Sequence, residues 1–519
     1  MTIRPPHSVK NIPRRTVLAS MVLASLLGSA CSTTGGGNSN DPIASYNSAF
    51  SRGDYATAIT AIPAPAANDE SKETSPERDV FRLLHVAEAQ RLSGDYRGAI
   101  ASYEQAEAGL KKLDLESGLE KGLESAASFV GPASAQDYEP YEAEKILINT
   151  YKALAFLSLG EANDARVEFN RVNYRSQRAM QSFESEIASA NSKKLKLGDK
   201  EFSAKDLIPE GMTSQFENKT IEGDSFAGYE GFMLPASTYL HGIYNLASAD
   251  RDLDAASHSL RQLNDMYPEI SLFKNELSSA ESGSPLASQL VWVVYENGTG
   301  PSLVEQRADV DATLDISSMK FGVREDSVDP TEWRNSIQAQ NMTPYVISLA
   351  IPTATESKPV EPPFKISTHD AHDVSLTTFS SMTSVSNAEI ERRKPAMLTK
   401  AFGSSAVKVA AQALAANAAE KKGSGFGAFA ARGMGIATAK ATSADTRSWS
   451  SIPAHWEVAR FERPADGVMK VETGSVNGEL SLPSWSRVLV YVKRPSADTP
   501  LRVSLIDLNG QEPAIETTF

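Results

Sequence analysis

The stretch of sequence that decides the fold is residues 87–106, AEAQRLSGDYRGAIASYEQA. Small alanines recur at helical spacing on both sides of Gly94. Small residues let two helices approach closely, and glycine permits a tight turn because it accepts backbone angles that other residues avoid. Tyr96 and Tyr103 are large enough to fill the space between the two helices. The stretch therefore predicts a helical hairpin that turns at Gly94.

Looser copies of this pattern return through residues 44–283. Their turn positions are Gly53, Gly94, Gly160 and, in the weakest copy, Arg251. The pattern resembles the tetratricopeptide repeat (TPR), although its uneven spacing departs from the period of about 34 residues. We predict degenerate helical hairpins, interrupted by loops over 120–140 and 193–231. The resemblance implies a concave surface that binds other proteins. The alternative is that the hairpins only support the second half of the chain.

The second half of the chain has the apolar runs that are typical of β-strands. These runs predict strands over 290–295, 345–351, 455–461, 468–473, 488–492 and 501–508. We expect Pro352 to end the second of these strands. The dipeptides Asp466-Gly467 and Asn477-Gly478 suit tight hairpin turns, because both accept positive φ. An antiparallel, sandwich-like arrangement of the strands is therefore expected.

An alanine-rich insertion over 388–440 interrupts these strands. Its first part, residues 388–420, is predicted to be mostly helical, with Asn387 as the N-cap and a kink at Pro395. One face of this helix is apolar and consists of Leu398, Phe402, Val409 and Ala413. Such a segment is compatible with close helix packing, a mobile flap or contact with a membrane.

The composition is that of an ordinary globular protein, with 41% hydrophobic and 22% charged residues. A chain of 519 residues is long enough for two or three domains. The expected fold class is α+β. A TPR-like helical domain over 44–283 is followed by an antiparallel β-rich domain over 284–519, which carries the helical insertion.

Residues 1–30 have the layout of a signal peptide. A basic segment over 1–15 is followed by an apolar, uncharged segment over 16–30, which is too short for a comfortable membrane span. Small residues then lead into Cys31, the single cysteine of the chain, so no internal disulfide can form. This order resembles the lipobox of bacterial lipoproteins, except that Gly28 stands where the family has leucine.

The lipobox resemblance implies that Cys31 is diacylated and becomes the first residue of the mature protein. Two or more acyl chains hold a protein durably to a membrane, and residues 31–43 would form a flexible tether. Ser32 stands in place of aspartate, which implies transfer to the outer membrane, facing the periplasm. The alternative is ordinary secretory cleavage near Ala30, which leaves a free thiol. The pair Arg14-Arg15 leaves both general and twin-arginine export open.

Several further phrases together resemble a family of uncharacterised bacterial lipoproteins. These phrases are ARVEFNR at 165–171, LPASTYLHG at 234–242, ENGTGP at 296–301 and ADTRSWSSIP at 444–453. Members of that family are often encoded beside lipoproteins that activate peptidoglycan synthases. The resemblance therefore implies a process, cell-wall synthesis, and assigns no catalytic residue.

Three groups of residues could carry chemistry, and each has a plainer interpretation. Asp445, Arg447 and Trp449 suit a structural clamp or a docking site for a partner. His369 and His372, with acids beside them, could form part of a metal site or a polar loop. Residues 423–428 match the dinucleotide pattern GxGxxA but follow a helix and not a strand. We therefore predict no catalytic residue, no metal and no cofactor.

The sequence thus predicts a non-enzymatic scaffold or adaptor that binds envelope proteins at the periplasmic face of the outer membrane. The family resemblance implies an alternative, an accessory regulator of peptidoglycan synthesis. A third hypothesis is a periplasmic hydrolase that uses His369 and His372 or an unrecognised pair of acids. The formal net charge is −14, and residues 1–30 contain only basic charges, so the remainder is more acidic still. This charge argues against nucleic acid and against adhesion to anionic lipid headgroups.

Overall fold

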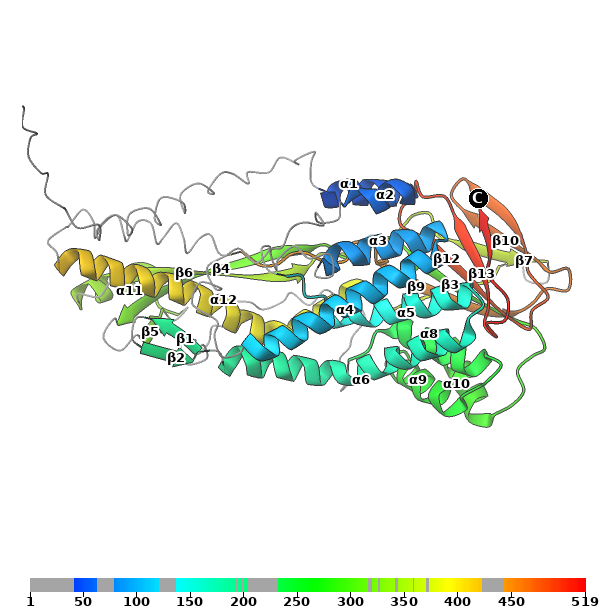
Figure 1. Ribbon diagram of the computed structural model, residues 1–519, viewed down its shortest axis with the longest axis horizontal. Helices are drawn as coiled ribbons and strands as arrows, with labels where there is room; N and C mark the ends of the chain where they lie inside the picture. The colour runs from blue at the N-terminus through cyan, green and yellow to red at the C-terminus, as the bar shows by residue number, and fades with distance from the viewer. Residues whose placement is uncertain are drawn as a thin grey trace, which may run out of the picture.

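The computed structural model describes the larger part of the chain. The described residues are 42–62, 79–120, 137–192, 194–197, 200–203, 232–315, 320–324, 327–340, 344–357, 359–369, 373–421 and 443–519. They form a mixed α+β fold, as expected, in which helices precede strands (Figure 1). Among the described helices, none is long and apolar enough to span a membrane.

Helical hairpins make up the first half. They are α1 (Pro42–Ser51) with α2 (Tyr55–Ala61), α3 (Val80–Ser93) with α4 (Tyr96–Glu120), α5 (Glu142–Ser158) with α6 (Ala162–Ser192), and α8 (Pro235–Ala247) with α9 (Leu253–Met266), followed by α10 (Ser271–Ser282). The predicted turns at Gly53, Gly94 and Gly160 are confirmed, with φ of +74°, +89° and +76°. Within the predicted loop over 193–231, β1 (Lys194–Leu197) and β2 (Lys200–Ser203) form a small hairpin. The remainder of that loop, and residues 121–136 of the predicted loop over 120–140, lie outside the described residues.

The glycine turns of the hairpins also contact residues from the C-terminal part of the chain. A Cβ at Gly94 would lie 2.7 Å from Nη2 of Arg502, and one at Gly53 would lie 2.9 Å from Cδ of Pro500. Nearby, the backbone N–H of Ala514 donates to the carbonyl oxygen of Ser158 at 3.0 Å. Three successive hairpins therefore present their turns to residues 500–514.

We expect Gly94→Ala to lower the free energy of unfolding by about 1–2 kcal/mol, because φ is left-handed there. A further loss should come from displacing Arg502, which is paired with Glu516 at 3.1 Å. Gly283→Ala is the matched control, since Gly283 has φ of +63° but its nearest neighbour would be 3.7 Å away. Urea unfolding measures both variants. Equal losses would mean that the contact with Arg502 contributes nothing.

The largest sheet has six strands in the order β14-β13-β12-β3-β9-β8. Their bounds are β3 (Leu290–Asn297), β8 (Thr377–Phe379), β9 (His455–Glu462), β12 (Arg487–Arg494), β13 (Arg502–Asp507) and β14 (Ile515–Thr518). The expectation of an antiparallel arrangement is wrong for one pair, since β12 and β3 run parallel. A parallel pair needs a long crossover connection, and here the connection includes α12 and two smaller sheets.

Of the two predicted hairpin turns in this half, one is wrong, and the other forms a turn that does not close a hairpin. Asn477-Gly478 lies inside β11 (Val476–Ser481), and β11 pairs with β10 (Val468–Thr473) across Gly474, whose φ is +61°. The missing side chain at Gly478 instead leaves room for the ring of Phe519. Asp466-Gly467 does form a turn, but β9 and β10 belong to different sheets. Strands β10 and β11 belong to a three-stranded sheet with the order β11-β10-β7, in which β7 is Lys365–Thr368.

A third sheet carries the alanine-rich helix. It has the order β5-β4-β6 and consists of β4 (Leu303–Asp315), β5 (Lys320–Val323) and β6 (Pro344–Ala354), with α11 (Pro330–Ala339) before β6. The predicted apolar face of the helix is confirmed: Leu398, Phe402 and Val409 pack against Ile347 and Leu349 of β6. In Figure 1 this lobe extends from one end of the helical layer.

Two predicted boundaries in this lobe are wrong. The helix, α12, spans Met382–Lys421, so it begins before Asn387 and continues through Pro395. Strand β6 does not end at Pro352 but continues to Ala354. A proline is tolerated there because β6 is an edge strand, where a missing N–H breaks no ladder on the open side.

The six-stranded sheet is the middle layer of the molecule. One of its faces packs against the helices, and its Trp292 and Tyr491 belong to the same apolar core as Tyr151 and Leu154 of α5. The other face packs against the sheet β11-β10-β7 through a second apolar core. The change from helix to strand occurs between Ser282 and Leu290, and the core continues across it.

Candidate functional site

Four charged side chains meet where helix α3 lies on the six-stranded sheet. Glu88 and Arg91 are three residues apart on α3 and therefore share a face. Glu296 and Lys493 are opposite each other in the parallel register of β3 and β12. None of the four side chains is more than 5% exposed. We call these residues the buried charge cluster.

The buried charge cluster is connected by short ion pairs. Arg91 Nη2 lies 2.8 Å from Glu88 Oε1, and Lys493 Nζ lies 2.5 Å from the same oxygen. Lys493 Nζ is also 3.0 Å from Glu296 Oε2, and Arg91 is 3.7 Å from that atom. Two acids are thus balanced by two bases. Balance of this kind is what allows charges to remain in a dry interior.

Aromatic residues enclose the buried charge cluster. The hydroxyl of Tyr103 donates to Glu88 Oε2 at 3.0 Å, and the indole N–H of Trp456 donates to Glu296 Oε1 at 3.1 Å. The Tyr491 hydroxyl also donates to Glu296. The guanidinium of Arg91 lies 4.3 Å from the centroid of the Tyr151 ring. The charges of the cluster are therefore balanced by protein groups, although Glu296 Oε2 has ion pairs and no hydrogen bond.

Electrostatic interactions keep Glu88 and Arg91 ionised. Burial raises the pKa of Glu88, but Arg91 and Lys493 outweigh it and hold that pKa below its ordinary value. Burial lowers the pKa of Arg91, but Glu88 outweighs it and holds that pKa well above its ordinary value. A general acid or base works best with a pKa near the operating pH. Neither Glu88 nor Arg91 meets that condition.

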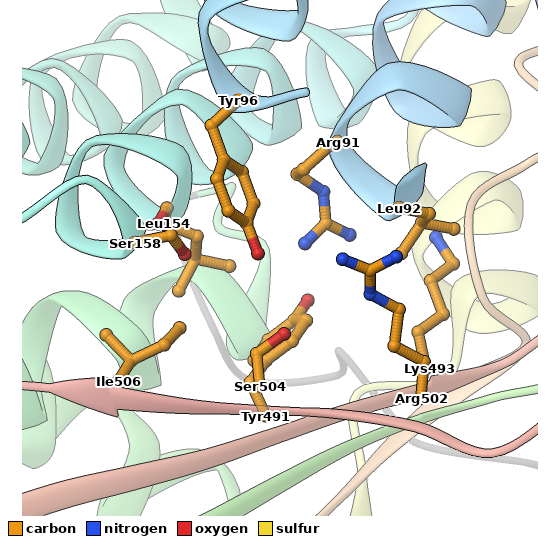
Figure 2. A pocket seen from close by; sticks show the side chains of 10 residues that line it. All are labelled: Arg91, Leu92, Tyr96, Leu154, Ser158, Tyr491, Lys493, Arg502, Ser504 and Ile506. Carbon is orange, nitrogen blue, oxygen red and sulfur yellow. Dashed lines mark hydrogen bonds between the residues drawn. The ribbon is translucent and has the colours of Figure 1, made fainter. Parts of the chain in front are cut away.

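A small cavity adjoins the cluster, as Figure 2 shows. Tyr96, Ser158, Ser504 and the basic side chains of Arg91 and Arg502 are among the residues that line it. Its volume is about 20 Å³, which is enough for about one water molecule. An organic substrate does not fit. The cluster and its cavity thus join the two halves of the chain and do not form a substrate pocket.

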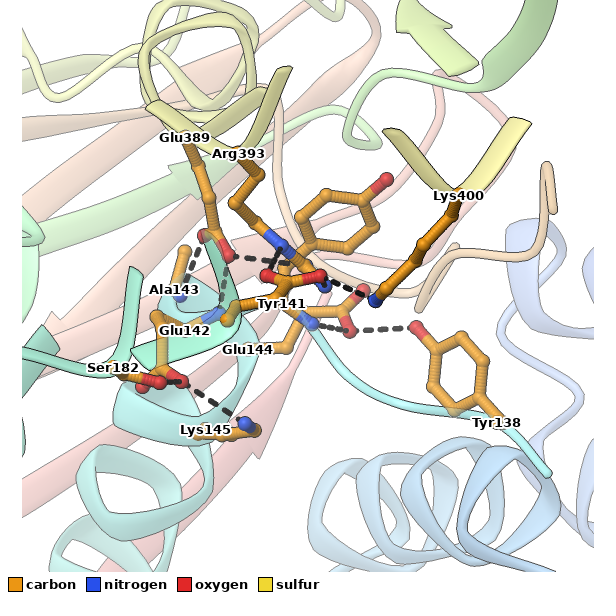
Figure 3. Close-up of polar contacts among 11 residues, drawn as sticks. Tyr138, Tyr141, Glu142, Ala143, Glu144, Lys145, Ser182, Glu389, Arg393 and Lys400 are labelled. Carbon is orange, nitrogen blue, oxygen red and sulfur yellow. Dashed lines mark hydrogen bonds and ion pairs between the residues drawn. The ribbon is translucent and has the colours of Figure 1, made fainter. Parts of the chain in front are cut away.

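A second polar cluster attaches α12 to helices α5 and α6 (Figure 3). Glu389 accepts the backbone N–H groups of Glu142 and Ala143 at 2.6 and 3.1 Å, which caps the N-terminus of α5. Next to it, Glu186 of α6 accepts from Arg393 at 2.7 Å and from Lys400 at 2.7 Å. The carboxylates thus join three helices.

The two carboxyl groups of this second cluster differ in their pKa. Burial raises the pKa of Glu186, but Arg393 and Lys400 outweigh burial and lower it to about 2. Burial raises the pKa of Glu389 to about 7, although Arg393 and the two N–H donors act against it. Glu389 is therefore a group that titrates near neutral pH inside a helix junction.

A third buried carboxyl group belongs to Glu276 of α10. Its Oε1 accepts from the indole N–H of Trp292 at 2.8 Å and from the hydroxyl of Tyr239 at 3.2 Å. Arg460 is a more distant cation, at 3.9 Å. Burial raises the pKa of Glu276 to about 7, and the weak interaction with Arg460 offsets only part of this.

The structure separates the members of the predicted cluster Asp445, Arg447 and Trp449. Arg447 Nη2 pairs with Asp445 Oδ2 at 2.7 Å, and both side chains are partly exposed. The Trp449 ring is fully buried and contacts the rings of Tyr103 and Tyr151 at their edges. A docking role therefore stays a prediction, and it rests on the Asp445–Arg447 pair.

Several other predicted site residues cannot be placed. Cys31, His372 and residues 423–428 lie outside the described residues, while His369 is described and exposed. Within the part of the chain that the structure describes, no three His, Cys, Asp or Glu residues are grouped so that they could hold a metal ion.

The sequence interpretation did not identify the buried charge cluster. A signal was present, because Glu88 lies between Ala87 and Ala89 on the packed face of its helix, and Glu296 directly follows the apolar run 290–295. The comparisons with known proteins add no assignment. No family model, no curated protein and no solved structure matches the chain.

Proposed function

We propose that this protein is a non-enzymatic adaptor of the bacterial cell envelope. Lipid on Cys31 would hold it at the periplasmic face of the outer membrane, where it would bind other envelope proteins. The observation that carries this proposal is the use of buried charges. The buried charge cluster and the cluster around Glu389 are balanced or satisfied by protein groups and join one element to another.

The helical half supports binding as the activity. Three of its four described hairpins turn at glycines with positive φ, and the hairpins pack side by side, which supports the resemblance to the tetratricopeptide repeat. In the β-rich half, which we propose is sandwich-like, the sheet β11-β10-β7 covers the far face of the six-stranded sheet and would present a second surface. An accessory role in peptidoglycan synthesis remains the second candidate, and it rests on the family resemblance.

The anchor is tested by labelling cells with a fatty-acid analogue and separating the membranes. We expect the unchanged chain to carry label and to sediment with the outer membrane, and Cys31→Ala to lose both. Ser32→Asp is the matched control, since by the lipobox resemblance it should keep the label and remain in the inner membrane. An unlabelled wild-type chain, or a Cys31→Ala chain that remains membrane-bound, would contradict lipid anchoring.

The adaptor activity is tested by crosslinking in intact cells with a tagged chain, alongside Cys31→Ala. We expect defined envelope proteins to be captured only by the anchored form. Capture of wall synthases or their activators would favour the second candidate. Failure to capture any protein reproducibly would contradict both.

A further inference from the structure

The outer face of helix α6 has an unusual composition for this acidic protein. Val167, Arg171, Tyr174 and Arg178 are spaced four, three and four residues apart, so they share one face of the helix. We call these four residues the α6 face. In Figure 1, α6 runs along the lower edge of the helical layer.

Two side chains of the α6 face are large and hydrophobic and are exposed to solvent. Val167 is 48% exposed and Tyr174 is 55% exposed. Among the described residues, the other strongly exposed large hydrophobic side chains are Val304 and Ile515, which lie on different strands. Single exposed hydrophobic residues need no explanation. A pair seven residues apart on one helix has the spacing of a helix-binding seam.

The α6 face is also positively charged. Beneath it, three cations meet two carboxylates: Lys152 contacts both Glu107 and Glu168, Arg171 contacts Glu168, and Arg175 contacts Glu107. One positive charge is therefore left over within this network. Arg171, which is half exposed, is its most exposed member.

Tyr174 is held in place before any partner arrives. The guanidinium of Arg178 lies 5.3 Å from the centroid of its ring and donates to its hydroxyl. Tyrosine and arginine are the residue types that most often dominate binding energy at interfaces, and an ordered side chain loses less entropy on binding. The α6 face thus combines an ordered aromatic side chain, Tyr174, with the positive charges of Arg171 and Arg178.

We propose that the α6 face binds an acidic amphipathic helix of another protein, an inference that rests on the adaptor function proposed above. The four residues span about 16 Å along the helix axis, which equals three turns of a partner helix. Apolar residues of the partner would cover Val167 and Tyr174, and its acidic residues would flank them opposite Arg171 and Arg178. Complementary charge would also fix the register.

A second copy of this chain is a poor occupant. If two α6 helices packed antiparallel across Tyr174, Arg171 of one copy would face Arg178 of the other. Like charges so placed oppose association. An anionic membrane would match the charge of the face, but the net charge of −14 repels it from the molecule as a whole.

The experiment places photoreactive benzoylphenylalanine at single positions of the full-length chain in living cells. Positions 167 and 174 probe the α6 face, 304 is a matched control for exposure, and 447 probes the other predicted docking residue. Crosslinked peptides are then sequenced. We expect positions 167 and 174 to crosslink to one partner segment that is acidic and has apolar residues at helical spacing.

Charge reversal tests the same contact. Arg171→Glu combined with Arg178→Glu should lower the crosslinking yield at position 174 at least tenfold. The membrane location should not change. Thermal unfolding should shift only slightly, because Arg171 is half exposed and Lys152 still contacts Glu168. The control variant Val304→Ser should leave the yield unchanged.

The remaining outcomes separate this inference from the proposed function. Partner crosslinks at 447 but none at 167 or 174 would overturn the assignment to the α6 face and leave the adaptor function standing. Crosslinks at 174 to lipid, to a basic segment or to a second copy of this chain would also overturn it. An absence of crosslinks at every position would contradict the adaptor function itself.

Discussion

Replacing Lys493 with methionine should lower the free energy of unfolding by about 3–5 kcal/mol. Methionine keeps most of the length of the side chain between Phe50 and Tyr151. It removes the cation that contacts both Glu88 and Glu296, each of which is fully buried. Breaking a buried ion network by removing one partner leaves an uncompensated charge in a medium of low polarity. Urea unfolding of the purified variant measures the loss.

A second substitution distinguishes charge from packing. When Glu88→Gln is added to Lys493→Met, the cluster is again electrically balanced, with Arg91 facing Glu296 at 3.7 Å. We expect the double variant to be more stable than Lys493→Met alone, because the remaining two charges of the cluster neutralise each other. The free-energy changes of substitutions at contacting residues are not additive. The surface control Lys470→Met breaks an exposed pair with Glu479 and should change stability by less than about 1 kcal/mol. Additive losses in the double variant would contradict the argument.

Replacing Glu276 with glutamine should make the protein progressively more stable than the wild type as the pH rises from 4.5 to 7. The pKa of this carboxyl group is raised from 4.5 to about 7 in the folded protein. Below pH 4.5 the group is protonated whether the chain is folded or unfolded. Between pH 4.5 and 7 it ionises in the unfolded chain first, so stability falls as the pH rises, by roughly 3 kcal/mol in total. Above pH 7 no further change comes from this group.

Glutamine at position 276 can still accept from Trp292 and Tyr239 but does not ionise. The variant should therefore gain stability relative to the wild type as the pH rises from 4.5 to 7. Unfolding in urea at several pH values measures this. Glu389 contributes in the same direction. His85 and His241 contribute in the opposite direction, because burial lowers the pKa of each to about 4. The comparison is therefore between the variant and the wild type at each pH. Glu479→Gln, at a largely exposed carboxylate, is the control. A stability difference between the variant and the wild type that does not change between pH 4.5 and 7 would contradict this prediction.

Local features of this fold could be predicted from the sequence. Glycines beside small residues identified the hairpin turns, because the signal and the structure it specifies are both within a few residues. Apolar runs identified β3, β9, β10 and β12 for the same reason. The Asn477-Gly478 turn failed because a competing turn at Gly474 closes the hairpin, and Phe519 occupies the space beside Gly478.

Long-range features could not be predicted in this way. Glu88 and Lys493 are 405 residues apart, and neither stretch of sequence alone indicates that the other will neutralise it. The parallel pairing of β3 with β12 is likewise a property of the crossover and not of either strand. Trp449 shows the same limit: it follows Arg447 closely in sequence, but its ring packs between helices while the Asp445–Arg447 pair stays near the surface.

The dependence of helix α3 on strand β12 has a consequence for the order of folding. The hairpins can form as soon as their residues have been synthesised, but α3 holds Glu88 and Arg91 on the face that must later be buried. Until β12 is present, those charges keep that face hydrated and oppose premature collapse. The central sheet also depends on contacts between distant residues, which form slowly. The nascent chain should therefore keep this face open to water until its late strands complete the central layer.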